Sequence, residues 1–297
     1  MKIRDIIFVL VILPLCSCAK DILDLKQDES EAGEARIIVV ESIEKTADKL
    51  ENYCTFEGVT YVAQGTAICG NILYRLYDTG LCQTYSIEDI SNPRKLATFE
   101  LGSRKDLNHC NCAQIMLPDN GDTLLYVGGL RGKCFVERIS TDHSELVQTI
   151  TLPQLGIFHN TQNMNMICGD DGFLWLFGEA RATQTLFFAK ARLPLISEGD
   201  VVLSQADIID YWHESGYVYN ESVWQGGMVY EGNLFYVFGR GESNRHIAVY
   251  NTYNHTKVED INLNGIVTEE PEDCDMHGGY IVLSVYGGKG YYLLKLM

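Results

Sequence analysis

Five long polar residues recur along the chain in positions that suit them to hold a small ligand. Each is followed four residues later by an aliphatic residue or methionine, and then by a glycine-bearing turn and an apolar strand. Amide side chains donate and accept hydrogen bonds, and a carboxyl group can also transfer a proton. We call these residues the openers; they are Gln64, Asn111, Asn163, Gln225 and Glu272.

Groups with acid–base or stacking chemistry lie beside the openers. His109 and His159 each come shortly before an opener, and histidine is the side chain most often used as a general base. Glu270 and Glu272 are both candidates for a proton shuttle. Trp224 directly precedes the fourth opener, where its ring could stack on a sugar. The candidate catalytic groups are therefore the two histidines and the two glutamates.

A cation recurs after the second apolar strand of four of the five repeats. These cations are Arg131, Arg181, Arg240 and Lys289. In a chain with a net charge of -17, their recurrence at one position of the repeat indicates a local positive rim that binds a carboxylate or sulfate. Each cation by itself also fits an ordinary solvated turn. The opener amides also fit hydrogen bonds between neighbouring strands, so both alternatives stay open.

The spacing of the openers indicates the fold that must position these groups. Successive openers are 47, 52, 62 and 47 residues apart, and each repeat carries β-type segments. A repeat of this length is typical of a β-propeller. We therefore predict an all-β, five-bladed propeller. The first strand of each blade lines the central channel, so the openers should form a ring at one mouth, with the four cations on loops of the same face.

The N-terminal part of the chain is expected to close this ring. The fifth repeat ends at the C-terminus without an outer strand. Lys49–Phe56 precedes the first opener at nearly the same offset as Lys95–Leu101 precedes the second. We therefore expect Lys49–Phe56 to complete the last blade, which joins the ends of the ring and removes open sheet edges. The propeller domain is predicted to span residues 47–297.

The first 46 residues have the features of a targeting segment and a tether. Residues 1–18 combine two early basic residues with a short apolar run, which is typical of a signal peptide. Leu15–Cys18 resembles the lipobox of bacterial lipoproteins, which implies lipidation of Cys18; an uncleaved membrane anchor is the alternative. The residues after Cys18 lack the aspartate of inner-membrane retention, so the resemblance implies outer-membrane attachment. Residues 19–46 are polar and acidic and predict a tether.

The composition argues against several other classes of function. The net charge of -17 disfavours a nucleic-acid partner, which needs a basic surface. The chain has no phosphate-binding loop, G-x-S-x-G elbow, H-E-x-x-H motif or C-x-x-C pair. We therefore expect no metal and no cofactor, and membrane contact only through the lipid anchor. Most of the eight cysteines after Cys18 fit small buried apolar residues better than a dense disulfide framework.

Several segments resemble uncharacterised secreted or lipoprotein propellers of Gram-negative bacteria, over roughly residues 60–297. The segments are Asn108–Asn111, Trp224–Gly227, Asn233–Tyr236, Glu270–Glu272 and Gly287–Gly290. The family forms are N-H-x-N followed by Ser or Ala, H-Q-G-A, and E-P-E-G, and the chain departs from them at Cys112, Trp224 and Asp273. The resemblance implies a propeller but no established activity, and the tryptophan argues against histidine chemistry at that position. The Q-G openers also resemble, over short segments, five-bladed bacterial glutaminyl cyclases.

Two classes of function fit these residues. In the first, the protein is a surface or periplasm-facing lipoprotein that binds a small anionic ligand, such as an acidic oligosaccharide, at the channel mouth. In the second, the same mouth is an active site. A lyase of uronic-acid polysaccharides would use His109 or His159 as its base, and a glutaminyl cyclase would use Glu270 or Glu272 as its proton shuttle. No set of residues completes a catalytic template, which favours binding.

Overall fold

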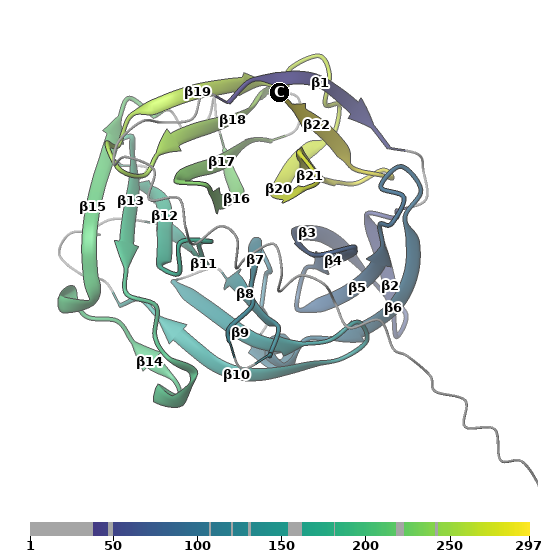
Figure 1. The fold of residues 1–297 in the computed structure, drawn as a ribbon, viewed down its shortest axis with the longest axis horizontal. Coiled ribbons are helices and arrows are strands. Elements are labelled where there is room, and N and C mark those ends of the chain that lie inside the picture. The colour runs from purple at the N-terminus through teal and green to yellow at the C-terminus, as the bar shows by residue number, and fades with distance from the viewer. Residues whose placement is uncertain are drawn as a thin grey trace, which may run out of the picture. The chain divides into compact units, whose positions relative to one another are not determined.

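Five small sheets stand in a ring around a common axis, and each sheet forms one blade of a propeller (Figure 1). The computed structural model describes residues 38–46, 50–106, 108–119, 121–129, 132–153, 162–180, 182–217, 223–240 and 243–297. The chain divides into two units, Met1–Ala32 and Gly33–Met297, and all described residues belong to the second. The ring of five sheets confirms the predicted all-β, five-bladed propeller.

The three inner strands of each blade follow one another in chain order, whereas β1 (Val40–Lys45) and β14 (Val201–Val202) join blades from elsewhere in the chain. Blade 1 contains β2 (Tyr53–Phe56), β3 (Val59–Cys69), β4 (Ile72–Tyr77), β5 (Leu81–Ser86) and β6 (Arg94–Glu100). Blade 2 contains β7 (Cys112–Met116), β8 (Leu124–Gly129), β9 (Lys133–Ile139), β10 (Ser144–Thr151) and β14 (Val201–Val202). Blade 3 contains β11 (Gln162–Cys168), β12 (Leu174–Ala180), β13 (Thr185–Ala191) and β15 (Ile208–Ser215).

The last two blades have four strands each. Blade 4 contains β16 (Trp224–Tyr230), β17 (Asn233–Arg240), β18 (Ser243–Asn251) and β19 (Lys257–Asn262). Blade 5 contains β20 (Glu270–His277), β21 (Tyr280–Tyr286), β22 (Tyr292–Leu296) and β1 (Val40–Lys45). Short 3-10 turns are η1 (Gly102–Asp106), η3 (Ile196–Glu198) and η4 (Gln205–Asp207).

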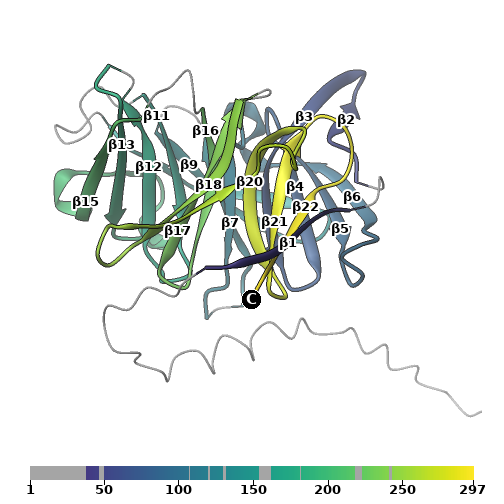
Figure 2. The ribbon, with the colours of Figure 1, turned by 90° about the horizontal axis from the view of Figure 1, so that it is seen from above.

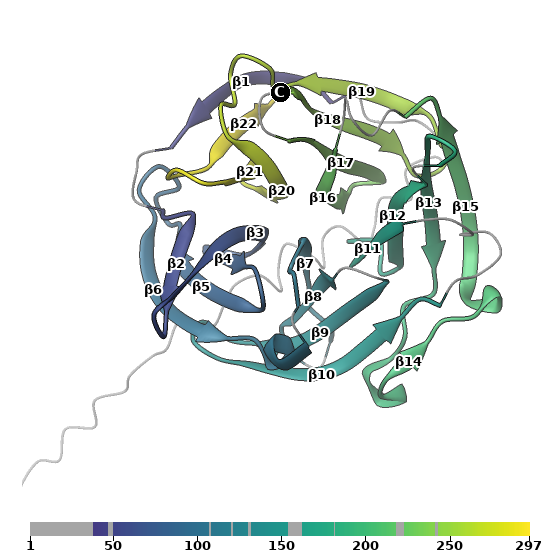
Figure 3. The ribbon, with the colours of Figure 1, turned by 180° about the vertical axis from the view of Figure 1, so that it is seen from behind.

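The hydrophobic core lies between the blades, which explains the apolar second strand of each repeat. Every residue of β8 and of β12 is buried, because a neighbouring blade covers each face of these strands. The outer strand β19, in contrast, is mostly exposed or half-buried. The inner strands β3, β7, β11, β16 and β20 surround the axis (Figures 1 and 3). Consecutive inner strands contact each other, so their first residues converge at one end of the ring.

The ring is closed by an N-terminal strand, as predicted, but the strand is β1 rather than Lys49–Phe56. β1 pairs antiparallel with β22, and the order of blade 5 is β1-β22-β21-β20. Its apolar side chains pack on the core of blades 4 and 5, where Ile43 contacts the same cluster as the buried Ile38. The last residues of the predicted tether are therefore part of the sheet.

The segment expected to close the ring forms a hairpin in blade 1 instead. Tyr53–Phe56 pairs with the start of β3 through the tight turn at Glu57 and Gly58. Both turn residues have positive φ, 50° and 80°, which is the backbone of the two-residue hairpin turn that matches strand twist. The Glu57-Gly58 pair commits Tyr53–Phe56 to β3, so this segment is not free to reach blade 5.

The predicted signal peptide, Cys18 and residues 19–37 of the predicted tether lie outside the described residues. Within the described part of the chain, no helix has the length and apolar character needed to cross a membrane. All eight cysteines of the propeller are buried and none is paired in a disulfide.

Candidate functional site

A cavity of about 320 Å³ lies at the end of the ring where the inner strands begin. Its volume is at the small end of the range for ligand pockets, roughly 300–1,000 Å³. It is lined by Gln64, His109, Asn111, Val223, Trp224, Gln225, Arg240, Glu270, Glu272 and Tyr286. Four of the five openers therefore meet at one place, together with one predicted histidine, one predicted cation and both glutamates. We call this cavity the mouth cavity.

Glycines that follow two openers allow the inner strands to crowd together. A Cβ atom on Gly65 would lie 2.6 Å from the Cys110 carbonyl oxygen, and one on Gly226 would lie 2.3 Å from the carboxyl of Asp273. Side-chain carbon atoms do not approach other atoms this closely. The Q-G pairs in the sequence thus combine a ligand-sized amide with a residue that permits close approach of backbones.

The inner strands are joined at the axis by the carboxyl group of Asp273 in β20. Its Oδ2 accepts hydrogen bonds from the backbone N–H of Thr66 at 2.9 Å and of Ala113 at 3.1 Å. Its Oδ1 accepts one from the N–H of Gly227 at 2.8 Å. One fully buried side chain therefore connects blade 5 to blades 1, 2 and 4. Sequence reasoning treated Asp273 only as a departure from a family motif.

A series of amide hydrogen bonds runs from blade to blade around the mouth cavity. Asn111 Nδ2 donates to Asn165 Oδ1 at 3.1 Å, and Asn165 Nδ2 donates to the Gln225 carbonyl at 2.8 Å. Gln225 Nε2 in turn donates to Glu270 Oε1 at 2.7 Å. Asn111 and Gln225 thus make the inter-blade hydrogen bonds that the sequence left as an alternative. Asn165 was missed, although it lies two residues after an opener and so on the same strand face.

Two lining side chains are left without such partners. Neither the Gln64 amide nor the Glu272 carboxyl makes a hydrogen bond to any residue that the structure describes, although both are more than nine-tenths buried. The Trp224 Nε1 is buried and also has no partner in the described part of the chain. Because the Gln64 and Glu272 side chains line the cavity, their unused hydrogen-bonding capacity is open to a molecule that enters it.

Burial raises the pKa of the Glu272 carboxyl well above its usual range. The neighbouring Glu270 raises it further, because two like charges cannot both be ionised cheaply at close range. The buried guanidinium of Arg75 opposes this shift. Arg75 Nη2 donates to Asn52 Oδ1 at 2.6 Å and to the Val285 carbonyl at 2.8 Å. Glu272 is consequently a neutral acid over a wider pH range than an exposed glutamate.

His109 forms a pair with Asp78 at the edge of the mouth cavity. The Nδ1 of His109 lies 2.8 Å from Oδ1 of Asp78. Burial acts to raise the pKa of Asp78, but the hydrogen bonds from His109 and from the Thr79 backbone outweigh it, and the net pKa is lowered. The carboxylate therefore orients the imidazole, so Nε2 remains available as a base. Asp78 had no signal in the repeat pattern.

The predicted cations do not all belong to this cavity. Arg240, at the end of β17, is exposed and lines it. Lys289 is exposed in the turn between β21 and β22 and does not line it. Arg131, Arg181 and His159 lie outside the described residues, as does the side chain of Asn163, whose backbone belongs to β11. The positive rim as a whole therefore stays a prediction.

Trp224 is placed differently from the expected stacking platform. Its side chain is only 5% exposed and belongs to an aromatic cluster between blades 3 and 4, with Phe188, Trp212 and Tyr236. Burial in this cluster leaves little ring face for a sugar. The aromatic residue that sequence reasoning missed is Tyr286, which lines the cavity and is 40% exposed.

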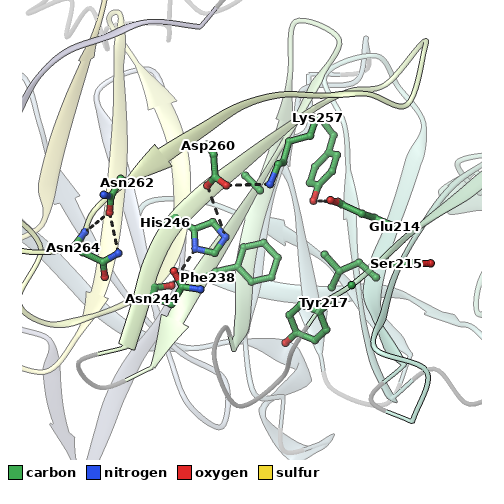
Figure 4. A pocket seen from close by; sticks show the side chains of 14 residues that line it. Glu214, Ser215, Tyr217, Phe238, Asn244, His246, Lys257, Asp260, Asn262 and Asn264 are labelled. Carbon is green, nitrogen blue, oxygen red and sulfur yellow. Dashed lines mark hydrogen bonds and ion pairs between the residues drawn. The ribbon is translucent and has the colours of Figure 1, made fainter.

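A second and larger cavity, of about 550 Å³, lies between blades 3 and 4 (Figure 4). We call it the inter-blade groove. Two pairs of its polar side chains contact each other: Lys257 Nζ lies 3.0 Å from Asp260 Oδ2, and Tyr250 donates a hydrogen bond to Glu214. The described residues contain no group of three or more potential ligands that could hold a metal ion.

Comparison with known proteins shows similarity in fold only. No family model matches the chain, and no curated protein matches it in sequence. The glutaminyl cyclase of Myxococcus xanthus has 12% identity and a TM-score of 0.49, and the match covers 88% of this chain and 96% of that one. An exo-β-1,3-galactanase from Clostridium thermocellum has 12% identity and a TM-score of 0.48, over 86% and 62% of the two chains. A β-1,3-galactosidase of glycoside hydrolase family 43 has 8% identity and a TM-score of 0.45, over 82% and 89%.

Proposed function

We propose that the protein binds a small acidic sugar in the mouth cavity. The observation that carries this proposal is the pair of buried, unpaired groups, the Gln64 amide and the Glu272 carboxyl, that line a cavity of ligand size. A bound molecule with several hydroxyl groups supplies the hydrogen-bond partners that these side chains lack.

The charges around the cavity favour a ligand with one carboxylate. Among the described glutamate and arginine side chains that line it, Arg240 supplies positive charge, and the raised pKa of Glu272 reduces the negative charge over a wider pH range. Glu270 already accepts a hydrogen bond from Gln225, which reduces its repulsion of an anion. Arg240 lines the cavity and supplies a positive charge for the ligand carboxylate, and Glu272 supplies a donor wherever it is protonated.

The protein is proposed to work as an outer-membrane lipoprotein, attached through acylated Cys18, with no nucleic-acid partner. The signal-peptide pattern of residues 1–18 and the lipobox-like segment Leu15–Cys18 support this proposal from the sequence alone. Metabolic labelling with a fatty-acid probe tests it: the label should be incorporated by the parent protein and lost in Cys18→Ala. Incorporation that survives the substitution contradicts the assignment.

Calorimetric titration of the full chain in mild detergent with galacturonate and glucuronate tests the binding proposal. We expect Gln64→Ala and Glu272→Ala each to weaken binding about tenfold or more, because a buried hydrogen bond to a charged group contributes roughly 1.5–3 kcal/mol. Glu214→Gln, in the inter-blade groove, is the matched control and should bind as the parent does. Equal affinity in all four proteins contradicts the proposal.

The pairing of His109 with Asp78 favours a second candidate, a lyase that acts on the same class of ligand. In this reaction His109 Nε2 removes the proton next to the sugar carboxylate, and Arg240 stabilises the resulting negative charge. The bond to the neighbouring sugar breaks, a carbon–carbon double bond forms, and Glu272 gives its proton to the departing oxygen. A glutaminyl cyclase would instead use Glu270 and Glu272 without the histidine.

Turnover distinguishes these candidates from simple binding. Polygalacturonate incubated with the full chain should develop the ultraviolet absorbance of an unsaturated uronate if the protein is a lyase. His109→Gln should then lower the rate about a hundredfold or more while galacturonate still binds. Cyclisation of an N-terminal glutamine peptide that is unaffected by His109→Gln would favour the cyclase. If neither substrate gives a product, binding is the only one of these functions that remains.

A further inference from the structure

Two exposed tyrosines lie side by side next to the mouth cavity. Tyr286 ends β21 and lines the cavity, and Tyr53 begins β2. Their ring centroids are 6.5 Å apart with an interplanar angle of 72°, an edge-to-face contact. They are 40% and 43% exposed, whereas most large apolar side chains of the described residues are buried. We call this pair the tyrosine shelf.

The shelf is held rigidly by buried polar contacts. Asn52, directly before Tyr53, is fully buried, and its Nδ2 donates to the carbonyls of Gly287 at 2.7 Å and Gly290 at 3.3 Å. Arg75 donates to Asn52 Oδ1 at 2.6 Å. The hairpin of β2 and β3 is thereby fastened to the turn that follows Tyr286. Figure 2 shows this hairpin at the end of the ring where β16 begins, which is the end of the mouth cavity.

A cation completes the edge of the shelf. The backbone of Lys289 forms an isolated antiparallel bridge with Glu51, two residues before Tyr53. Lys289 is exposed and makes no ion pair with any residue in the described part of the chain. Lys289 thus lies three residues after Tyr286, its backbone is paired two residues before Tyr53, and it is outside the lining of the cavity.

We infer that the tyrosine shelf is a second subsite, which binds the next sugar unit of an acidic oligosaccharide whose first unit occupies the mouth cavity. The apolar face of a sugar ring stacks on exposed aromatic rings, and Tyr286 belongs to both places, so the two subsites are continuous. The carboxylate of the second unit pairs with Lys289. This inference rests on the proposed function and narrows its ligand from a single acidic sugar to an oligomer.

Binding as a function of ligand length tests the inference. We expect the full chain to bind galacturonate trimers about three- to tenfold more tightly than the monomer, which is the effect expected of one or two aromatic contacts. Tyr53→Ala should remove this gain and leave monomer affinity unchanged. Tyr53→Phe should keep it, because the ring and not the hydroxyl carries the contact. The matched control is Tyr211→Ala, which changes a tyrosine of β15 that is 50% exposed against 43% for Tyr53.

A substitution of Lys289 tests the charge at the edge of the shelf independently of the tyrosines. Lys289→Met should weaken trimer binding, more at low salt than at high salt, and should not change monomer binding. Trimer affinity equal to monomer affinity in the parent protein overturns the shelf while the mouth-cavity proposal stands. Equal losses for monomer and trimer in Tyr53→Ala make Tyr53 a structural residue and also overturn it. Failure of both monomer and trimer to bind contradicts the proposed function, and the shelf with it.

Discussion

The mouth cavity and the inter-blade groove differ in how their polar groups are used. The groove is the larger, about 550 Å³ against about 320 Å³. Its carboxyl groups Glu214 and Asp260 already have partners in Tyr250 and Lys257. In the mouth cavity, Gln64 and Glu272 have none in the described part of the chain. Both carboxyl groups of the groove are paired, whereas the Glu272 carboxyl is not, so this difference and not volume distinguishes the candidate site.

The difference has a structural cause. The groove lies between the outer strands of two blades, where long side chains have room to turn toward each other. The mouth cavity lies where inner strands converge, and Asp273 and the glycines after the openers hold their backbones close together. Side chains at such a ring are fixed in place by their strands, so some cannot reach a partner.

The largest expected effect is loss of the axial carboxyl group. Asp273→Ala leaves three buried backbone N–H groups without their acceptor, and each unsatisfied group costs roughly 1–3 kcal/mol. We expect the free energy of unfolding to fall by about 3 kcal/mol or more, measured by urea denaturation. Asp260→Ala in the groove breaks an exposed pair, and its expected loss is about 1 kcal/mol or less. Similar losses of unfolding free energy in the two variants would contradict the proposed difference between the axis and the groove.

The acidic groups of β20 should make stability depend on pH. Burial raises the pKa of Asp275 to about 7. A carboxyl whose folded pKa is raised stabilises the fold fully below its unfolded pKa, near 4, and loses that contribution as pH rises to about 7. The Asp275→Asn variant, which keeps an oxygen to accept from Ile68, should show a smaller fall in thermal stability over pH 4–7.

The same variant tests whether sugar binding depends only on the end of β20 that carries Glu270 and Glu272. Asp275 lies five residues beyond Glu270 and does not line the mouth cavity, so sugar binding should be unchanged in Asp275→Asn. A parallel loss of binding would place the site away from the cavity described above.

Glu272→Gln should change the pH dependence of binding rather than its presence. Because the pKa of Glu272 is raised, the protonated form that donates to a ligand carboxylate is lost only as pH rises through that elevated value. Binding by the parent should therefore weaken toward alkaline pH. The glutamine amide always donates, so the variant should bind with a flatter profile. Identical titration profiles would exclude Glu272 as the ligand's donor.

The smallest effect is expected when one cation of each cavity is replaced and the change in galacturonate affinity is compared. Arg240→Gln should weaken galacturonate binding about tenfold at low salt and less at high salt, since Arg240 is exposed and its charge is screened. Lys257→Gln in the groove, whose charge is paired with Asp260, should leave affinity unchanged at every salt concentration. Equal responses of the two variants would argue for a general electrostatic effect instead of a local contact.

Much of the architecture was predictable from local sequence, because each blade repeats one local pattern. The spacing of the openers predicted five blades and a ring of openers at one mouth. In the structure Gln64, Asn111, Gln225 and Glu272 line one cavity. The closing strand was misassigned because Val40–Lys45 and Lys49–Phe56 are both short β-type segments with no distinguishing periodicity. The positive φ values of Glu57 and Gly58 decide between them, and the Glu-Gly pair was the available signal.

The sequence by itself determined which residue types recur and on which strand ends they lie, since period and turn chemistry are local properties. Only the tertiary structure decided which of those residues hydrogen-bond to each other or pack against each other. Asn165 hydrogen-bonds to the Asn111 side chain and to the Gln225 backbone. Trp224 packs in the aromatic core, and the ring of Tyr286 contacts the ring of Tyr53. Such pairings join residues from different blades, and their distances depend on how the whole ring closes.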